Sequence, residues 1–313
     1  MELVQGINNF HAPASGVVAT LGNFDGVHRG HRALVERMLG LGRQQGLPSL
    51  VMIFEPQPLE FFQPASAPVR IMRVEDKVAA LAELGVDYVL LLPFDQSFSQ
   101  QSPEHFIRDL LVKAAQVKHL VIGDDFRFGK NRAGDFQLLC EEGHRYGFAV
   151  ENTASVVIEG QRVSSTLIRQ LLVQGDFELA TKFLGAPFAL SGQVVHGRAL
   201  GRTIGVPTAN IALNRLKAPV QGVFVVEWLD DQQRAFGGVA NVGRRPTVNG
   251  EDELLEVHLF GCDADLYGAQ ARVTFLKKIR DEQRFDKIEQ LKAQINCDIA
   301  QARSFFAERI SAH

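Results

Sequence analysis

Two kinds of apolar pattern alternate in the first half of the chain, and this alternation restricts the fold more than any other feature. Continuous apolar runs of strand length occupy residues 17–21, 49–54, 88–92 and 119–122. Segments with helical spacing separate them, at residues 32–41, 75–84 and 103–112. Strands buried on both faces of a parallel sheet have such continuous runs, so the pattern predicts a doubly wound α/β domain. In that fold, ligands bind beyond the carboxyl ends of the strands.

The pattern changes near residue 184. Glycine-punctuated segments of alternating character then follow, at residues 189–195, 223–229, 236–242, 254–260 and 271–279. They predict an antiparallel β-barrel or sandwich, and the helical rhythm of residues 286–309 adds a C-terminal helix. The 313 residues are enough for two cores, and we place the boundary after Gly185, giving domains 1–185 and 186–313.

Composition narrows the choice of partners. The net charge of −3 gives no sign of a nucleic-acid or membrane surface. The three cysteines lie far apart without C-x-x-C spacing, which favours reduced thiols over a zinc site or a disulfide framework. Because Glu2 is not followed by a long apolar run, we expect no signal peptide. These observations predict a cytoplasmic protein that acts on small molecules, with no nucleic-acid and no membrane partner.

The segment from Gly22 to His31 carries the first candidate site. It leads from the first predicted strand into the first predicted helix, where exposed N–H groups and the helix dipole favour anions. His28 and His31 share one face of a first turn, so both can reach one phosphoryl group. The alternative is two polar residues that cap the helix. The candidate phosphate-binding residues beside this histidine pair are Gly22, Asn23, Phe24, Asp25 and Gly30.

Three consecutive hydroxyl residues, Ser164, Ser165 and Thr166, precede an apolar helical run. Arg169 lies one turn further and faces the same way as Ser165. A helix N-terminus with hydroxyls and an arginine can hold a polyphosphate, although an ordinary N-cap explains the hydroxyls equally well.

Two further segments follow predicted strands. The loop from Gly123 to Gly129 combines acids, aromatics and bases, which suits a ligand lid or simply a polar loop; its candidate residues are Asp125, Phe126 and Phe128. The turn containing Phe54, Pro56 and Pro58 is stiffened by its prolines. Such a turn can frame a flat ring, and a purely structural turn explains it equally well.

In order and spacing, these four segments resemble the nucleotidyltransferase module of prokaryotic FAD synthetases. The resemblance implies that His28 and His31 stabilise the α-phosphate of ATP and the leaving pyrophosphate, together with the segment from Ser164 to Arg169. It places the loop from Gly123 to Gly129 beside the nucleotide, with Asp125 as a candidate ATP contact and Phe126 and Phe128 as candidate flavin contacts. It places the proline-rich turn beside the flavin, with Phe54, Pro56 and Pro58 as candidate flavin contacts. The family usually has a histidine between the prolines, whereas this chain has Gln57.

The second domain contains the segment Pro207-Thr208-Ala209-Asn210. In an extended chain Thr208 and Asn210 point the same way and present two neutral oxygens, which suit a Mg²⁺ ion also held by substrate phosphates. Upstream, Gly201 and Gly205 allow backbone N–H groups to wrap those phosphates. A hairpin with glycine turns is the alternative.

Glu256 and His258 lie on one face of a predicted strand. A strand carboxylate is ordinarily surface, but opposite an ATP site Glu256 can accept the proton of an attacking hydroxyl. The sequence has no P-loop and no H-R-D motif of protein kinases, so a kinase here would use another scaffold.

From about Pro187 onward the chain resembles riboflavin kinase. The resemblance implies that Thr208 and Asn210 contact magnesium and ATP phosphates, that Glu256 is the base for the ribityl 5′-hydroxyl, and that Arg280 lies near the flavin. Together the two resemblances imply a bifunctional enzyme that converts riboflavin to FMN and FMN to FAD, with ATP as co-substrate and Mg²⁺ as cofactor.

Two other functions compete with this one. The first domain could adenylylate another acceptor while the barrel only senses flavin, but the intact Thr208, Asn210 and Glu256 argue against this. The chain could also bind flavin or nucleic acid without turnover, and its nearly neutral charge argues against the nucleic-acid version.

Overall fold

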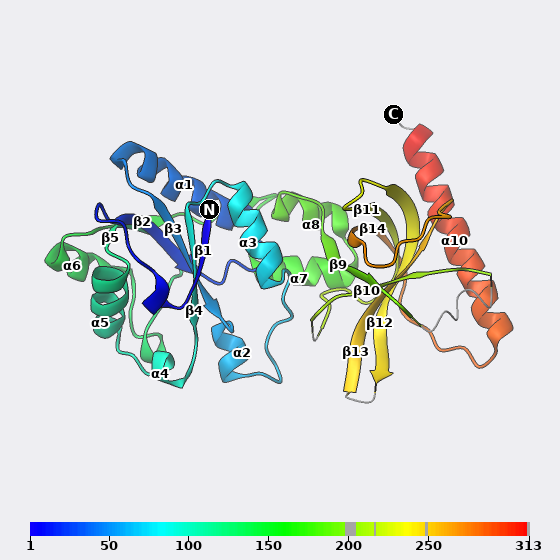
Figure 1. Cartoon of the computed structure of the whole chain (residues 1–313), viewed down its shortest axis with the longest axis horizontal. Coiled ribbons are helices and arrows are strands. Elements are labelled where there is room, and N and C mark those ends of the chain that lie inside the picture. Colours follow the sequence, from blue (N-terminus) through cyan, green and yellow to red (C-terminus); the bar gives the residue numbers. More distant parts are fainter. Residues whose placement is uncertain (198–204, 216, 248–249, 312–313) are drawn as a thin grey trace. The chain divides into compact units, whose positions relative to one another are not determined.

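The structure is a computed structural model that describes residues 1–197, 205–215, 217–247 and 250–311 (Figure 1). The chain divides into two compact units, one of Met1–Pro68 with Met72–Ser165 and the other of Val69–Ile71 with Thr166–His313.

The first unit is built on a six-stranded sheet in the order β1-β4-β3-β2-β5-β6. Every neighbouring pair is parallel, as the alternating pattern predicted. The strands are β1 (Glu2–Gln5), β2 (Val17–Gly22), β3 (Ser49–Glu55), β4 (Tyr88–Pro93), β5 (Val117–Gly123) and β6 (Ala149–Thr153).

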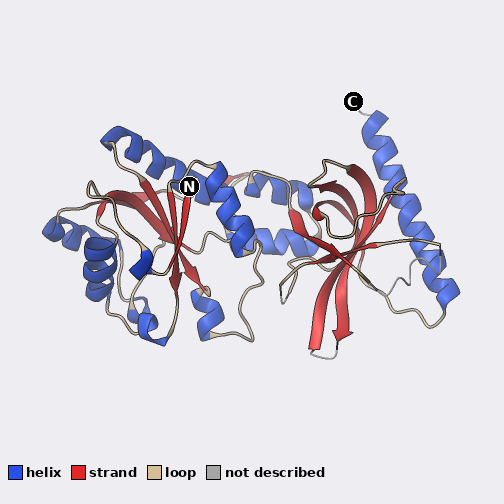
Figure 2. Ribbon diagram, in the orientation of Figure 1, coloured by secondary structure: helices blue, strands red, loops and turns tan. Residues whose placement is uncertain are grey.

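Helices cover both faces of this sheet (Figure 2). One apolar core joins the strands to α1 and α3, and the other joins them to η2 and α6. The helical segments are η1 (Ile7–Asn9), α1 (Arg29–Gln45), α2 (Pro58–Phe62), α3 (Val74–Glu83), α4 (Gln96–Ser99), α5 (Pro103–His105), the π-helical η2 (Phe106–Ala114), η3 (Lys130–Arg132) and α6 (Phe136–Tyr146). A small hairpin of β7 (Val157–Ile158) and β8 (Gln161–Arg162) completes the unit.

The sequence patterns do not predict the two edge strands. β1 and β6 have four and five residues, and most of their side chains are exposed or only partly buried. Neither strand therefore needs the apolar run that marks the central strands.

The second unit is a closed barrel in the order β10-β13-β12-β11-β14-β9, with every neighbouring pair antiparallel. The expected barrel with a C-terminal helix is therefore confirmed. Its strands are β9 (Ala189–Val195), β10 (Ala209–Ala212), β11 (Gly222–Asp230), β12 (Ala235–Thr247), β13 (Gly250–Leu259) and β14 (Gln270–Arg280). Its helices are α7 (Ser165–Gln174), α8 (Phe177–Leu184) and α10 (Ile288–Ser311).

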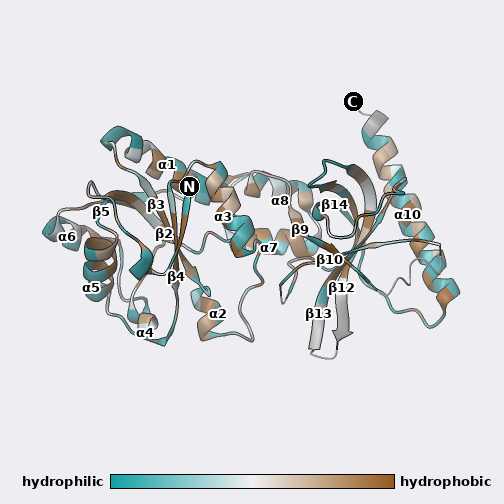
Figure 3. Cartoon of the chain, viewed as in Figure 1, coloured by the Kyte–Doolittle hydropathy of each residue, from teal (hydrophilic) through white to brown (hydrophobic). Residues whose placement is uncertain are grey.

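Helices pack against the barrel at two places. On α8, Phe177 lies 5.7 Å from Phe224 and 5.8 Å from Phe275 between ring centroids, so α8 contributes to the aromatic core of the barrel. At the second place, Ala302 of α10 packs in a cluster with Val223, Val225 and Val239 of the barrel strands. Teal and brown residues alternate along α10, as expected of a helix with one packed and one solvated face (Figure 3).

An ion pair also fixes α10. The Arg280 guanidinium donates through Nη2 to Asp298 at 2.7 Å and through Nε at 3.0 Å, and the Asp298 side chain is only 2% exposed. The amide of Gln294 donates to the same carboxylate at 2.9 Å. The structure therefore places Arg280, a candidate flavin residue, in a bidentate pair that anchors the C-terminal helix.

Removal of the Asp298 carboxylate leaves a largely buried guanidinium without its counter-charge. We expect Asp298→Ala to destabilise the second unit by about 3–5 kcal/mol. Urea unfolding can be followed by the fluorescence of Trp228, the single tryptophan of the chain, which is 1% exposed on β11. As control, Glu178→Ala removes an 88% exposed partner of Lys182 and should change stability by less than about 1 kcal/mol. Equal effects of the two substitutions would contradict this role of Asp298.

Candidate active sites

Helix α1 begins with a histidine cap. His28 is the N-cap residue, and its Nδ1 accepts a hydrogen bond from the backbone N–H of His31 at 3.2 Å. The two imidazoles stack with 3.6 Å between centroids and 11° between planes. A Cβ on Gly30 would come within 3.2 Å of the His28 ring, so glycine gives that ring its room. The structure thus brings the predicted pair together, and the capping alternative also holds for His28.

The surroundings of His31 favour its neutral form. Its Nδ1 is buried and has no hydrogen-bond partner within the part of the chain that the structure describes. Burial, with the nearby positive charges of His28 and Lys77, holds the pKa of His31 well below its usual range. At neutral pH its imidazole therefore provides one N–H donor, and an arriving phosphate would favour its protonation.

The loop from β2 to α1 is held in an uncommon backbone conformation. Phe24, Gly26 and Val27 all have positive φ, at 48°, 91° and 37°. Such angles persist in non-glycine residues only where the surroundings impose them. Between them, the buried carboxylate of Asp25 accepts the backbone N–H of Met72 at 3.1 Å.

Three side chains outside this stretch hold its carbonyl groups. Ser165 donates from Oγ to the Asp25 carbonyl at 2.8 Å, and Arg32 donates from Nε to the Val27 carbonyl at 3.1 Å. Lys77, fully buried on α3, donates from Nζ to the Asn23 carbonyl at 2.6 Å. Our sequence reasoning missed Lys77; its only signal is a lysine on the apolar face of a helix, one turn before two buried residues.

The other candidate residues of the phosphate segments lie as follows. Gly22 ends β2, Ser164 precedes α7, and Thr166 and Arg169 lie on α7. The Nε of Arg169 donates to the carbonyl of Val69 at 2.6 Å, within the second unit. Its predicted contact with ATP phosphates stays a prediction.

The loop after β5 is closed by an arginine. Arg162, on β8, pairs with Asp125 at 2.8 Å and with Asp124 at 3.1 Å. The rings of Phe126 and Phe128 stack at 5.7 Å. The candidate Asp125 is therefore tied to an arginine that the sequence motif did not include.

A band of phenylalanines crosses the carboxyl edge of the sheet. Phe54 packs against Phe94 at 5.7 Å, and Phe94 in turn packs against Phe61 and Phe62. Phe54 and Phe128, both proposed to contact flavin, are themselves buried at 8% and 5% exposure. The exposed aromatic of the band is Phe62 on α2, at 56%, which the sequence analysis missed although it follows the proline-rich turn.

In that turn, Gln57 caps α2 between Pro56 and Pro58 and is 7% exposed. Its backbone N–H donates to Glu60, whereas its side-chain Nε2 is buried and makes no hydrogen bond to any described residue.

In the second unit, strand register brings together the oxygen-bearing side chains. Glu256 on β13 lies directly opposite Asn210 on β10 and Asn241 on β12. Residues opposite one another in antiparallel strands project from the same face, so the three form a row. Asn210 is 6% exposed, and its Oδ1 has no hydrogen-bond partner among the described residues. A Cβ on Gly197 would overlap the Asn210 amide, which explains a glycine there.

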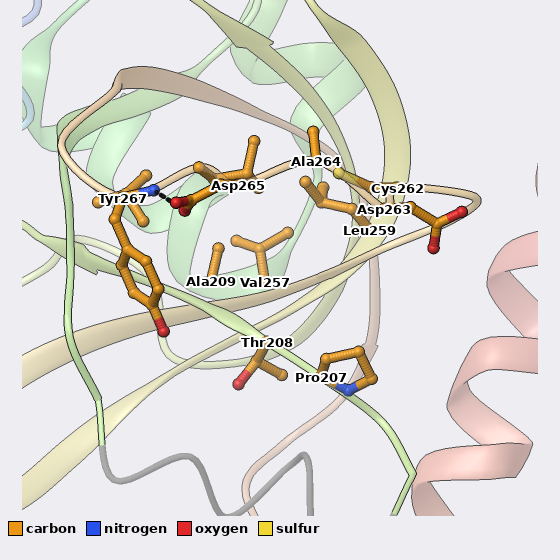
Figure 4. A pocket seen from close by; sticks show the side chains of 12 residues that line it. Pro207, Thr208, Ala209, Val257, Leu259, Cys262, Asp263, Ala264, Asp265 and Tyr267 are labelled. Carbon is orange, nitrogen blue, oxygen red and sulfur yellow. Dashed lines mark hydrogen bonds between the residues drawn. The ribbon is translucent and has the colours of Figure 1, made fainter.

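A cavity of about 360 Å³ lies on the other face of β10 and β13, and the three residues of the row are not among those that line it. Ala209 and Val257 lie in its middle, with Tyr267 on one side, Leu259 on the other and Thr208 at the lower edge (Figure 4). Its remaining lining residues are Val194, Pro207, Cys262, Asp263, Ala264, Asp265 and Leu266.

His258 connects β13 to the segment that contains Thr208. Its Nδ1 lies 2.8 Å from the carbonyl of Pro207, and because a carbonyl only accepts, Nδ1 carries the proton. Gly205 has a φ of 82°, and Gly201 lies outside the described residues.

Two protein families match the chain, one for each half. Residues 11–167 match the model of FAD synthetase, and residues 184–306 match that of riboflavin kinase. With the two sites described above, these matches define a two-domain, nucleotide-dependent transferase.

Relatives match over both halves at once. A "Bifunctional riboflavin kinase/FMN adenylyltransferase" of Escherichia coli strain K12 is 52% identical over 98% of each chain, and one of Pseudomonas fluorescens is 46% identical over 100% of each. A solved structure described as a macrolide-efflux protein of Streptococcus pneumoniae is 33% identical, covers 95% of this chain and 96% of its own, and has a TM-score of 0.78. The chain belongs to the bifunctional riboflavin kinase/FMN adenylyltransferase family.

Among the described residues, no helix combines the length and apolar character that a membrane crossing needs.

Substitution of Gly197 tests the row of oxygens. Gly197→Ala pushes a methyl group into the Asn210 amide, so we expect riboflavin phosphorylation to fall at least about tenfold, while FMN adenylylation is retained. Gly40→Ala on α1, where an added Cβ meets no atom within 4 Å, is the control and should preserve both activities. Initial rates with riboflavin or FMN as substrate measure the effect; an unchanged phosphorylation rate would contradict the packing argument.

The lowered pKa of His31 predicts a pH dependence of stability. The folded protein binds a proton at His31 less readily than the unfolded chain does. The free energy of unfolding of the first unit should therefore decline as pH falls below about 6.5. His31→Gln removes this contribution and should flatten the decline between pH 7 and pH 5 by up to about 1.4 kcal/mol per pH unit.

Urea unfolding followed by circular dichroism measures this slope, with Trp228 fluorescence identifying the transition of the second unit. His105→Gln, at an exposed histidine, is the matched control. Parallel curves for native protein and His31→Gln would show that His31 makes no such contribution.

Proposed function

We propose that the barrel domain, residues 186–313, transfers the γ-phosphoryl group of ATP to riboflavin, and that residues 1–185 join the FMN product to the α-phosphate of a second ATP. The observation that carries this proposal is that both family matches occur in one chain together with their candidate residues. The boundary after Gly185 follows the end of α8 at Leu184 and the start of the riboflavin kinase match at residue 184, whereas the compact units divide after Ser165.

In the barrel, the 5′-hydroxyl oxygen of riboflavin attacks the γ-phosphorus, and Glu256 accepts the hydroxyl proton as the bond to ADP breaks. Thr208 and the partnerless Oδ1 of Asn210 are suitable ligands for Mg²⁺. No described group of three or more His, Cys, Asp or Glu residues could hold a metal, which favours an ion shared with substrate phosphates. When bound, Mg²⁺ neutralises charge on the transferred phosphoryl group.

The cavity next to Thr208 supports a place for the adenosine of ATP. Its walls combine apolar side chains with the Tyr267 ring and two carboxylates, and a few polar groups in an apolar cleft are typical of small-molecule sites. With the adenine there, the phosphates would leave the cavity at its Thr208 edge.

In the first domain, the FMN phosphate oxygen attacks the α-phosphorus of ATP and pyrophosphate leaves. His28, His31 and Arg169 stabilise the charge on these phosphates, together with the N-terminus of α1. We propose no covalent enzyme intermediate, because the residues needed are donors and cations rather than an activated nucleophile.

The exposed Phe62 is the best-placed aromatic of the band for stacking on a flavin ring. The buried Nε2 of Gln57 lies in the neighbouring turn, and a buried amide donor without a partner favours a ligand acceptor. We propose that Gln57 donates to a polar edge of the isoalloxazine.

We also propose that the protein is cytoplasmic and acts on riboflavin, FMN and ATP without a nucleic-acid or membrane partner. The net charge of −3 and the free Cys140, Cys262 and Cys297 support this.

Separation of the two activities tests the proposal. With riboflavin and Mg-ATP, native protein should yield FMN and FAD on flavin chromatography, and unchanged riboflavin would refute the function. Glu256→Gln should lower FMN formation at least about 100-fold yet still convert added FMN to FAD. His28→Ala/His31→Ala should lower FAD formation about 100-fold or more and still make FMN.

If the barrel only senses flavin, Glu256→Gln leaves flavin products unchanged. If both variants lose both activities while folded, the division of labour between the domains is wrong.

A further inference from the structure

Lys77 is an ammonium group buried inside the first unit. Its side chain is 0% exposed on α3, and its Nζ lies 2.6 Å from the Asn23 carbonyl. Removing an ammonium from water is expensive, and apolar residues often replace a buried charge without loss of stability. A lysine at this position therefore suggests a function that a leucine or methionine could not fulfil.

The Asn23 carbonyl is the first fixed point of the loop that leads to the histidines. Immediately after it, the backbone passes through the positive φ angles of Phe24 and Val27. The loop is held further on at Asp25, by Ser165 and Met72. Of these hydrogen bonds, the one from Lys77 lies closest to β2, and it sets the direction in which the loop leaves the sheet.

We propose that Lys77 is a positioning residue of the adenylyl-transfer site: its ammonium fixes the Asn23 carbonyl, and thereby the loop and helix start that carry His28 and His31, and places a buried positive charge beside them. This inference rests on the proposed function of the first domain.

The charge acts on His31 as well as on the loop. Beside His31 lie the stacked His28, the Phe24 ring at 5.0 Å and the positive charge of Lys77. The positive charge of Lys77 disfavours a proton on His31, which adds to the effect of burial on its pKa. A polyphosphate brings negative charge to the same place, so its binding is favoured by Lys77 and coupled to proton uptake by His31.

The test uses the full chain and three variants. Lys77→Met removes charge and donor at similar length, Lys77→Arg keeps the charge, and Lys113→Met removes an exposed lysine of the same unit as control. Riboflavin phosphorylation in the second domain provides an internal reference for each preparation.

We expect Lys77→Met to lower kcat/KM for ATP in FMN adenylylation by about tenfold to 100-fold, the effect of misplacing catalytic groups. Lys77→Arg should recover part of this loss, and Lys113→Met should equal native protein. The His31 imidazole, assigned in NMR spectra by its loss in His31→Gln, should titrate at higher pH in Lys77→Met than in native protein. A merely structural lysine would not move this titration.

Inorganic pyrophosphate separates this inference from the proposed function. In native protein it should raise the pH at which His31 titrates, and Lys77→Met should bind it more weakly, whether or not the chain makes FAD. If native protein makes no FAD, the proposed function fails while the pyrophosphate titration still decides the role of Lys77.

Folded Lys77→Met with native adenylylation, His31 titration and pyrophosphate affinity would overturn the inference. If Lys77→Met unfolds the first unit, Lys77→Gln, which keeps a donor without the charge, replaces it in the same measurements. If Lys77→Gln unfolds as well, Lys77 is a folding residue and the inference is wrong.

Discussion

The hydrogen bond from the His31 amide to the His28 ring determines the geometry of the amino-terminal site. It uses Nδ1 of His28 as acceptor, so in the neutral ring the proton is on Nε2. It also fixes the start of α1 at Arg29 and brings the two imidazoles into a stack. The hydrogen bonds to the carbonyls of Asn23, Asp25 and Val27 support this contact, because they keep the preceding backbone in a conformation that it would not adopt alone.

The barrel site depends on a different constraint, the register of three strands. Asn210, Glu256 and Asn241 form a row only because β10, β13 and β12 pair in this register. A slip by one residue would turn the Glu256 side chain to the opposite face, where Leu255 and Val257 are fully buried. The apolar residues that alternate with Glu256 therefore fix its position, as hydrophobic burial specifies register.

The sequence was sufficient to predict the parallel sheet, the barrel and the positions of both motifs, because continuous and alternating apolar runs indicate which strand faces are buried. It placed the first helix three residues late, at residue 32, because His28 is not among the residues preferred as N-caps. It also missed β10, whose four residues are too few to show a period.

Contacts between distant residues were harder to predict. A lone lysine in a helical pattern ordinarily indicates the solvent face, so Lys77 gave no sign of its buried carbonyl contact. Arg280 looked like a ligand residue, and only the fold shows Asp298 beside it. Which arginine meets which acid depends on tertiary packing, and local sequence patterns do not contain that information.

The two proposed sites offer opposite kinds of group to a phosphate. The proposed amino-terminal site combines the buried ammonium of Lys77 and the N-terminus of α1 with two imidazoles, and proton uptake by His31 would add positive charge. The row in the barrel consists of oxygen acceptors, which cannot neutralise a phosphate and need a cation to do so. On the proposed function, the first transfer would respond to proton concentration and the second to metal supply, so the two transfers in one chain would respond to different properties of the solution.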